Sequence, residues 1–345
     1  MEMKYKLVVV TNKKLVNEFL KMPVDLYKND KNWIRPLDDD IEKIFDPKRN
    51  KYFKRGNAIR WILYDIHDKP AGRIAAFYLR DEKSENGQPT GGIGFFDCIN
   101  NQAAANTMFD AAKKWLQKNG MEAMDGPINF GSRETFWGCL SEGFYEPNYN
   151  MPYNYKYYNE LFENYGFKNY FDQFTFHMDL VPGIMDPVIY EKGKKLRENS
   201  KYSFKNIDLK NTDKYAQDFV TIFNETWSKF PGVNLMRKDQ AVRMFDKMKF
   251  ILDPKIMIFG YYEERPIAFY LMIPDLYQIT KHFNGKLHFI NKLRLLYNLK
   301  IRKAHTKVIG LIFGVVPEFQ NKGVADGMIL FFEDEVAKPG FRYTD

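Results

Sequence analysis

The chain has 345 residues, of which 45% are hydrophobic and 28% are charged. This composition is that of globular proteins and excludes intrinsic disorder, and the length favours two domains over one. The formal net charge of +8 favours anionic partners, a class that includes phosphate-bearing small molecules, nucleic acids and anionic membrane surfaces.

Cysteine and histidine usage argues against a disulfide framework and a metal site. Cys98 and Cys139 form no metal-type or redox-type spacing, and the five histidines are scattered. The N-terminal apolar run is too short for a signal peptide, and no stretch approaches the length of a membrane span. We therefore expect a soluble, cytoplasmic protein without a metal.

The first half of the chain alternates strand-like and helix-like segments. Runs rich in β-branched residues predict strands, and apolar residues at helical spacing predict helices. The strands are expected at residues 5–10, 60–64, 72–78 and 93–99, and the helices at residues 14–27 and 103–118.

Residues 181–200 are typical of a connector, with Pro182 and Gly183 before a basic helical stretch. Beyond the connector the same order of elements begins again. The strands are expected at residues 203–209, 256–262, 266–273 and 308–316, and the helices at residues 212–230, 241–251 and 325–336.

Two hairpins are similar at residue level, at residues 61–72 and 257–268. Each has an apolar strand, charged turn residues, then proline and a small residue, and each precedes another strand and helix. The repeat predicts an α/β (α+β) chain built from two copies of one module. We expect an N-terminal module at residues 1–180, the connector at 181–200, and a C-terminal module at 201–345.

The segment most informative about chemistry is the loop from Gln320 to Ala325, which follows a strand and opens a helix. Its spacing is Q-x-x-G-x-A. Backbone N–H groups that enter a helix N-terminus attract an anion, and the helix dipole adds to that attraction. Gly323 would let the backbone approach a pyrophosphate closely, Ala325 keeps the next position small, and Lys322 adds a cation.

These residues resemble the acyl-CoA loop of the GNAT superfamily of N-acyltransferases. The family pattern is Q/R-x-x-G-x-G/A after a strand that ends in V-x-P, and Val315-Val316-Pro317 precedes Gln320 here. The resemblance implies acetyl-CoA or another acyl-CoA as cosubstrate, with no metal. It implies that Gly314, Val315 and Val316 pair with the pantetheine arm, and that Gln320, Asn321, Lys322, Gly323, Val324 and Ala325 wrap the pyrophosphate. The alternative is a generic strand, loop and helix of an α/β protein.

The resemblance extends to the first module by layout, so both modules are expected to be mixed, mostly antiparallel sheets flanked by helices. Residues 100–105, at the place of the loop, have no glycine. Residues 161–167, LFENYGF, are similar to a GNAT segment whose tyrosine protonates the leaving thiolate in many members, but this chain has Phe162 there. The first module is therefore expected to bind cofactor poorly.

Polar and aromatic residues are dense between residues 125 and 158. Two interpretations stay open: a substrate pocket, or a surface loop fastened by its aromatic side chains. The candidate pocket residues are Asn129, Arg133, Glu134, Glu142, Tyr153, Asn154 and Tyr158. This stretch and residues 161–167 also resemble a group of bacterial proteins with two GNAT-like modules, a likeness that covers nearly the whole chain and assigns no substrate.

Residues 276–307 form an insertion in which basic and apolar residues alternate. Three interpretations compete: a solvated helix face, a helix that contacts a membrane surface, and a contact for the 3′-phosphate of CoA. Nucleic-acid binding would rest on charge alone, because no nucleic-acid motif is present. A homodimer is one of the assemblies open to this chain.

The family resemblance implies that an amine, on a small molecule or a peptide, attacks the thioester of acyl-CoA. A backbone N–H would stabilise the oxyanion and a carboxylate would take the amine proton. Glu225 and Glu263 are candidates for that carboxylate by position only. The alternative function is a catalytically inactive GNAT-like protein that binds a ligand or partner.

The second module is expected to be incomplete at its C-terminal end. About sixty residues follow Gly120 before the connector, whereas only residues 341–345 follow Gly340. We therefore expect an exposed or borrowed sheet edge near residues 308–316.

Overall fold

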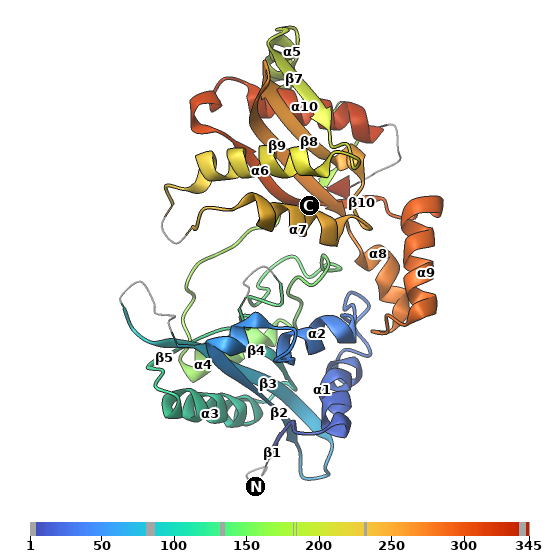
Figure 1. The fold of residues 1–345 in the computed structure, drawn as a ribbon. Coiled ribbons are helices and arrows are strands. Elements are labelled where there is room, and N and C mark those ends of the chain that lie inside the picture. Colours follow the sequence, from blue (N-terminus) through green and yellow to red (C-terminus); the bar gives the residue numbers. More distant parts are fainter. Residues whose placement is uncertain are drawn as a thin grey trace. The chain divides into compact units, whose positions relative to one another are not determined.

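A computed structural model describes residues 5–80, 87–131, 135–181, 183, 185–230, 233–337 and 343–344. The chain divides into two compact units (Figure 1). Unit 1 comprises Met1–Asp172 with Thr280–Asn291, and unit 2 comprises Gln173–Ile279 with Lys292–Asp345. This division differs from the expected ranges in two places: residues 173–200 belong to unit 2, and part of the basic insertion belongs to unit 1.

Unit 1 is a sheet flanked by helices. Its strands follow chain order, with antiparallel pairing from β1 to β4 and parallel pairing of β4 with β5. The strands are β1 (Lys6–Val9), β2 (Gly56–Tyr64), β3 (Pro70–Leu79), β4 (Thr90–Cys98) and β5 (Ala123–Asp125). The helices are α1 (Lys13–Leu26), α2 (Asp38–Phe45), α3 (Gln102–Lys118), α4 (Tyr157–Tyr165), and the 3-10 turns η1 (Lys51–Lys54) and η3 (Lys281–Phe283).

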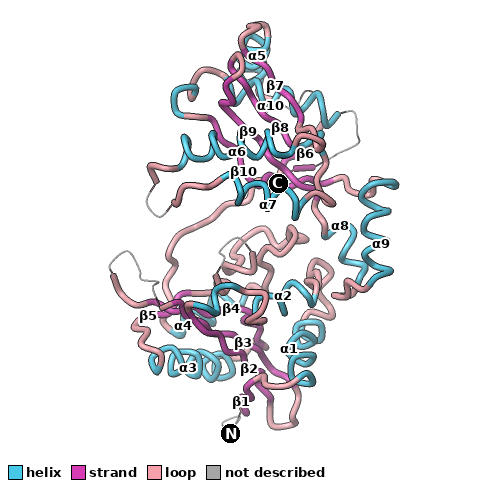
Figure 2. The backbone as a smooth tube through the Cα atoms, viewed as in Figure 1, coloured by secondary structure: helices cyan, strands magenta, loops and turns pink. Residues whose placement is uncertain are grey.

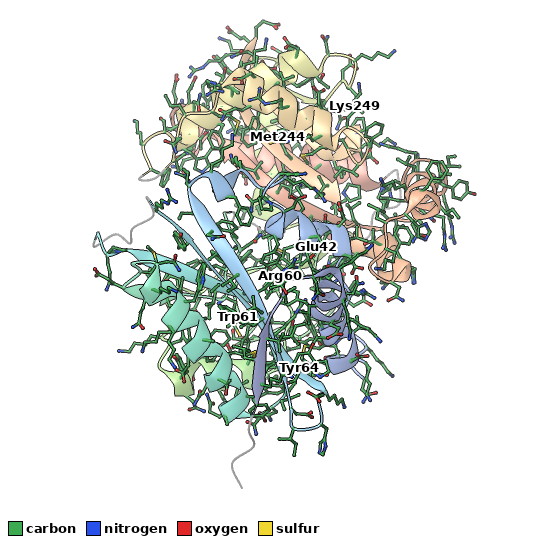
Figure 3. The ribbon with its side chains drawn as sticks, turned by 60° about the horizontal axis from the view of Figure 1, so that its bottom comes forward. Glu42, Arg60, Trp61, Tyr64, Met244 and Lys249 are labelled. Atoms are coloured by element: carbon green, nitrogen blue, oxygen red, sulfur yellow. The ribbon has the colours of Figure 1, made fainter. Side chains whose placement is uncertain are left out.

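Both faces of this sheet are covered, because successive side chains of a strand point to opposite faces. Leu63 packs with the cluster that includes α3, whereas Ile62 packs with the cluster that includes α1. On the α1 face, Arg60 donates to Glu42 of α2 at 2.5 Å (Figure 3). The Arg60 guanidinium also lies over the ring of Phe45. Successive side chains of β2 thus pack against helices on opposite faces of the sheet, which is why the strand has apolar residues on both faces.

The segment Thr280–Asn291 is fastened to unit 1 by backbone and charge. The Asp38 N–H at the start of α2 donates to the Gly285 carbonyl at 2.8 Å. Lys286 pairs with the Asp38 carboxylate at 2.5 Å, and Lys281 pairs with Glu146 at 2.8 Å. Part of the basic insertion is therefore a structural member of unit 1.

Unit 2 repeats the layout in a sheet of order β6-β11-β10-β9-β8-β7 (Figure 2). The strands are β6 (Met178–Asp179), β7 (Tyr202–Asn206), β8 (Met257–Tyr262), β9 (Arg265–Pro274), β10 (Lys307–Val315) and β11 (Tyr343–Thr344). The helices are α5 (Pro187–Arg197), α6 (Thr212–Trp227), α7 (Lys238–Met248) and α10 (Val324–Ala337), with the short turns η2 (Pro254–Ile256) and η5 (Pro317–Phe319). The insertion holds α8 (Tyr277–Thr280), α9 (Phe289–Tyr297) and the π-helical turn η4 (Asn298–Arg302).

Helices cover both faces of this sheet as well. Phe269 stacks on Phe219 of α6, whereas its neighbour Tyr270 contacts Phe332 of α10. The sheet is completed by β11, which pairs in parallel with the start of β10, and by β6, which pairs with β11. The sequence analysis placed the residues of β6 in the first module, but they belong to unit 2, so unit 2 itself supplies this strand. Two mixed sheets flanked by helices confirm the expected fold class.

Candidate functional site

The loop between β10 and α10 is tied to the end of its strand. Val316 donates its N–H to the Ile267 carbonyl at 2.9 Å, and the Gln320 side chain donates to the Val315 carbonyl at 3.0 Å. Phe319 is buried beneath the loop, and Lys322 Nζ lies 5.0 Å from the centre of its ring. Gln320 thus holds the turn against β10 and leaves Lys322 exposed at the rim.

Two residues of the loop have left-handed backbone angles, Asn321 with φ +60° and Gly323 with φ +81°. A Cβ built on Gly323 would make ordinary van der Waals contact with the Lys192 carbonyl oxygen at 3.7 Å and the Asp326 carboxylate at 3.8 Å, so the glycine is required by its backbone angle and not by lack of space. The first hydrogen bond of α10 runs from the Gly327 N–H to the Gly323 carbonyl. The N–H groups of Val324 and Ala325 precede it, and helix geometry gives them no partner within the helix. The loop has the backbone donors that an anion requires.

Charges of both signs surround the loop. Asp326 lies in the first turn of α10 and would oppose a bound phosphate. On the other side, the basic helix α5 packs against α10, where a Cβ on Gly193 would lie 2.7 Å from the Asp326 carbonyl. Lys192, Lys194 and Lys195 of α5 are exposed, and among the described residues none of them has an ion-pair partner. The connector helix therefore adds cations near the loop, a feature that sequence reasoning missed although Gly193 in a helix is a signal for close packing.

Both candidate carboxylates, Glu225 and Glu263, form ion pairs. Glu225 accepts from Arg265 at 2.8 Å, and Arg265 also binds Glu318 of the loop at 2.7 Å. These two carboxylates raise the pKa of Arg265, Glu318 having the larger effect. Glu263 lies in the β8–β9 turn, 3.4 Å from Lys201. The structure brings Glu225 close to the loop through Arg265 and uses Glu263 in a turn.

β10 has one long edge that the described residues leave largely without a strand. β11 pairs only with Lys307 and Val308, and the register of β10 shifts between Gly310 and Ile312. Beyond Val308 no described residue forms a strand on that side. Among the described residues, the backbone on this side from Ile309 to Gly314 has no strand partner, which is the arrangement that strand addition by an extended ligand requires.

Gly314 lies near the end of this strand, and packing explains why it is a glycine. A Cβ there would approach Trp227 of α6 to 2.5 Å. Gly314, Val315 and Val316 are buried. The indole therefore packs directly on the backbone at the place where the family resemblance locates the pantetheine arm.

The equivalent edge in unit 1 is occupied by the chain itself. β5 pairs with β4 only as far as Gly92, and the next contact is the Ile128 N–H on the Ile93 carbonyl at 2.8 Å. At the end of β4, the Cys98 N–H donates to the Tyr158 hydroxyl at 2.9 Å. Tyr157 donates to the Cys98 carbonyl at 2.7 Å. Three backbone groups at the outer edge of β4, the Ile93 carbonyl and both groups of Cys98, are thus bonded within unit 1.

The loop at residues 100–105 of unit 1 presents few backbone N–H groups to an anion. The Asn101 side chain accepts from the Ala104 N–H at the start of α3, and Gln102 donates to the Leu161 carbonyl. Phe162 is buried against Phe96 and Phe109 in the core. This side chain serves packing at the position where the family resemblance expects an acid.

The candidate pocket residues of the first module serve mostly to hold their own segment together. Asn154 exchanges hydrogen bonds with the backbone of Leu140, and Tyr153 donates to Asp30 at 2.9 Å. Tyr158 is buried, which raises its pKa, and its hydroxyl also accepts from Tyr27. Asn129 is buried and Glu142 is exposed. Arg133 and Glu134 lie outside the described residues.

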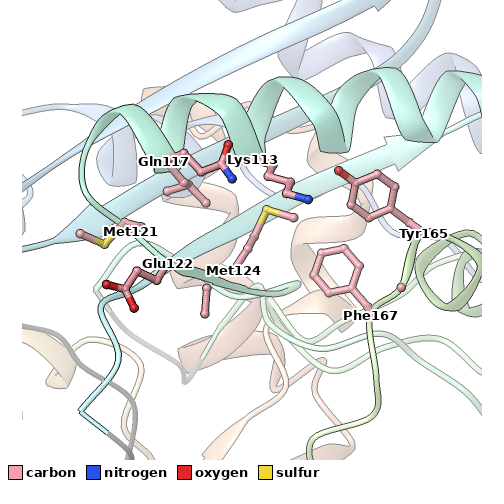
Figure 4. A pocket seen from close by; sticks show the side chains of 10 residues that line it. Lys113, Gln117, Met121, Glu122, Met124, Tyr165 and Phe167 are labelled. Carbon is pink, nitrogen blue, oxygen red and sulfur yellow. The ribbon is translucent and has the colours of Figure 1, made fainter.

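A pocket of about 210 Å³ lies elsewhere in unit 1, beside the end of α3, β5 and the end of α4 (Figure 4). Met124 and Phe167 line it, with Lys113 and Gln117 of α3 and Tyr165 of α4. The Tyr165 hydroxyl donates to Asp110 at 2.8 Å. The described residues among those proposed from the sequence for a substrate pocket are not part of its lining.

No group of three or more acidic, histidine or cysteine side chains is arranged to hold a metal ion in the described part of the chain. No described helix is long and apolar enough to cross a membrane.

Comparison with solved structures decides the fold. A tandem GNAT protein from the clavulanic acid biosynthesis pathway superimposes with a TM-score of 0.52 over 99% of this chain and 89% of its own, at 11% identity. The chain has a tandem GNAT-like fold. The GCN5-related glucosamine N-acetyltransferase region of a fungal multi-domain GH3 β-N-acetylglucosaminidase has a TM-score of 0.53 at 12% identity. That comparison covers all of this chain and 35% of the fungal one, so the GNAT-like chain spans about a third of it.

No family model matches the sequence. Two curated relatives match this GNAT-like chain over most of its length. Protein YghO of Escherichia coli K12 is 24% identical over 335 residues, which is 95% of this chain and 83% of YghO. The bacterial ceramide synthase of Caulobacter vibrioides is 25% identical over 309 residues, which is 89% of this chain and 79% of that protein.

Proposed function

We propose that this protein is an N-acyltransferase that takes its acyl group from acyl-CoA bound at unit 2. The observation that supports it best is the contrast between the two modules. The edge of β4 is satisfied by Tyr157, Tyr158 and Ile128, whereas the edge of β10 beyond Val308 has no strand partner among the described residues. The loop after β10 contains Gly323 at a positive φ, whereas the loop after β4, at residues 100–105, contains no glycine.

The residues present suit the phosphates and pantetheine arm of CoA. The backbone of Val324 and Ala325 would receive the diphosphate, and Lys322 with the lysines of α5 would offset the Asp326 carboxylate. The Val316 N–H and the Val315 carbonyl are already bonded, to Ile267 and Gln320, so the amides of the pantetheine arm would pair with the other backbone groups at the end of β10.

In this proposal the nitrogen of the acceptor amine attacks the thioester carbon. The new C–N bond forms as the C–S bond breaks, the thiolate leaves with the electron pair of that bond, and the proton lost by the amine ends on the thiolate, which gives free CoA thiol. Backbone N–H groups of β10 would stabilise the oxyanion. Neither Glu225 nor Glu263 is assigned to proton transfer, because each is held in an ion pair.

For the acceptor, we propose a long-chain amino alcohol or a similar lipid amine. The support is the name of one relative, the ceramide synthase of Caulobacter vibrioides, since a ceramide is an N-acylated long-chain amino alcohol. An inactive protein that only binds a ligand is the competing function, and the open edge and intact loop give no reason to prefer it.

The test is thiol release from acetyl-CoA and from a long-chain acyl-CoA, with and without a long-chain amino alcohol, and mass spectrometry of the product. Amide product that depends on both substrates supports the proposal, and Gly323→Asp should abolish it. Gly120→Asp is a matched control, because Gly120 has the same φ of +81° in unit 1 and no atom within 4 Å of its Cβ position. Binding of acyl-CoA without an amide product would support the inactive alternative.

A further inference from the structure

The helix α9 turns apolar side chains outward. Phe289, Ile290, Leu293 and Tyr297 are all exposed, Phe289 by 74%. At 3.6 residues per turn these positions share one side of the helix. Ile301 of η4, which continues the helix, is 71% exposed. An ordinary surface helix buries its apolar side, so this orientation requires an explanation.

The opposite side of the helix is held by polar and buried contacts, so the orientation is fixed locally. Asn291 is buried and donates to the Lys286 carbonyl at 2.7 Å. Leu299 is buried, and Lys300 Nζ donates to the Leu252 carbonyl at 2.8 Å. A rotation of the helix that buried its apolar side would break these contacts.

The surrounding segment is basic throughout. Between Asp275 and Glu318 there are eight lysines and arginines and no acidic residue. The formal net charge of the whole chain is also +8, so the rest of the chain carries equal numbers of each sign. Lys292 and Arg294 flank the apolar side of α9 at its two borders. Lys292, Arg302 and Lys303 are exposed, and the described residues include no ion-pair partner for them.

We propose that α9 with η4 is an interfacial helix that docks the protein on an anionic lipid bilayer. Its exposed apolar side chains would enter the boundary between headgroups and acyl chains, and the flanking cations would contact anionic headgroups. The nine residues of α9 and five of η4 fall short of the roughly 20 that a membrane-spanning helix needs, so the helix would lie in the surface plane.

Charge decides between a bilayer and a second copy of the chain. A symmetric dimer through α9 would place two basic segments without acidic residues against each other, which is unfavourable. An anionic bilayer supplies the opposite charge over the whole segment and accepts apolar side chains. The docking would give the protein access to a lipid amine, and this purpose rests on the proposed function. The docking itself does not depend on the proposed function.

The experiment is co-sedimentation of the full chain with phosphatidylcholine vesicles that contain or lack phosphatidylglycerol, without acyl-CoA. We expect binding that requires phosphatidylglycerol and weakens as salt is raised. The double variant Ile290→Glu/Leu293→Glu should bind at least about tenfold more weakly, because it loses two apolar contacts and gains negative charge. Ile66→Glu, an exposed apolar residue in the β2–β3 turn, is the matched control and should bind as wild type does.

Circular dichroism verifies that each variant is folded, as expected for substitutions of exposed side chains. Equal binding by the double variant and the control would overturn the proposal, as would an absence of binding by the wild-type chain. A dimer in solution that the double variant separates would also overturn it, in favour of a second copy on α9. Failure of acyl-CoA binding alone would leave the vesicle result intact and would count against the proposed function only.

Discussion

Removal of one hydroxyl group, by Tyr158→Phe, should destabilise unit 1 and leave the cofactor site unchanged. The Tyr158 hydroxyl accepts from the Cys98 N–H at 2.9 Å and from the Tyr27 hydroxyl at 3.1 Å. Cys98, Tyr27 and Tyr158 are all buried, so water cannot replace the lost partner. The substitution keeps the ring and therefore the packing.

Each buried donor left without a partner costs about 1–3 kcal/mol. The Tyr27 hydroxyl also has a hydrogen bond with Asp97, so the Cys98 N–H is the donor left without a partner, and we expect a loss of about 1–3 kcal/mol in the free energy of unfolding. For a unit of this size that corresponds to a decrease in melting temperature of roughly 2–12 °C.

Urea unfolding followed by tryptophan fluorescence suits this test, because Trp33, Trp61, Trp115 and Trp137 lie in unit 1 and only Trp227 lies in unit 2. Tyr145→Phe, at an exposed tyrosine, should be neutral. A change below about 0.5 kcal/mol in Tyr158→Phe would refute the reasoning that this hydroxyl closes the edge of β4. Loss of acyl-CoA binding with unit 2 still folded would refute the assignment of the cofactor to unit 2.

Two further predictions concern unit 2. Gly314→Val should lower the free energy of unfolding by about 1–3 kcal/mol in urea titrations, because its Cβ would lie 2.5 Å from the Trp227 ring, and an unchanged stability would contradict that packing. Burial lowers the pKa of His305 in spite of the Asp253 carboxylate, so the folded state keeps the imidazole neutral where the unfolded chain binds a proton. Stability should therefore fall as pH drops below about 6.5, and His305→Gln should reduce that fall; identical pH profiles would exclude this role.

Much of the architecture could be predicted from the sequence because its longer elements have clear periodicity. The helices α3 and α6 and the hairpin of β8 and β9 were expected within a few residues of their observed bounds. The strands β6 and β11 are two residues long and carry no periodic signal. Their pairing depends on contacts between residues far apart in the chain, which spacing cannot reveal.

The candidate site divides in the same way. Gln320 and Gly323 could be found from the sequence, because a strand, a glycine loop and a helix are local features. The hydroxyl of Tyr158 on the Cys98 N–H could not, because it joins residues sixty positions apart. The exposure of the apolar side of α9 could not be predicted either. A helical pattern of apolar residues shows that they share one side of the helix, but not whether that side is buried.

The central claim is that unit 2 binds acyl-CoA through the loop after β10, and calorimetric titration of acetyl-CoA and a long-chain acyl-CoA tests it most directly. Gly323→Asp and Gly120→Asp impose the same backbone penalty, of about 1–2 kcal/mol, at positions with the same φ of +81°. Binding by the wild type and by Gly120→Asp, with loss of binding in Gly323→Asp, is the predicted result. Binding that survives in Gly323→Asp, or no binding of either acyl-CoA to the wild-type protein, would contradict the claim.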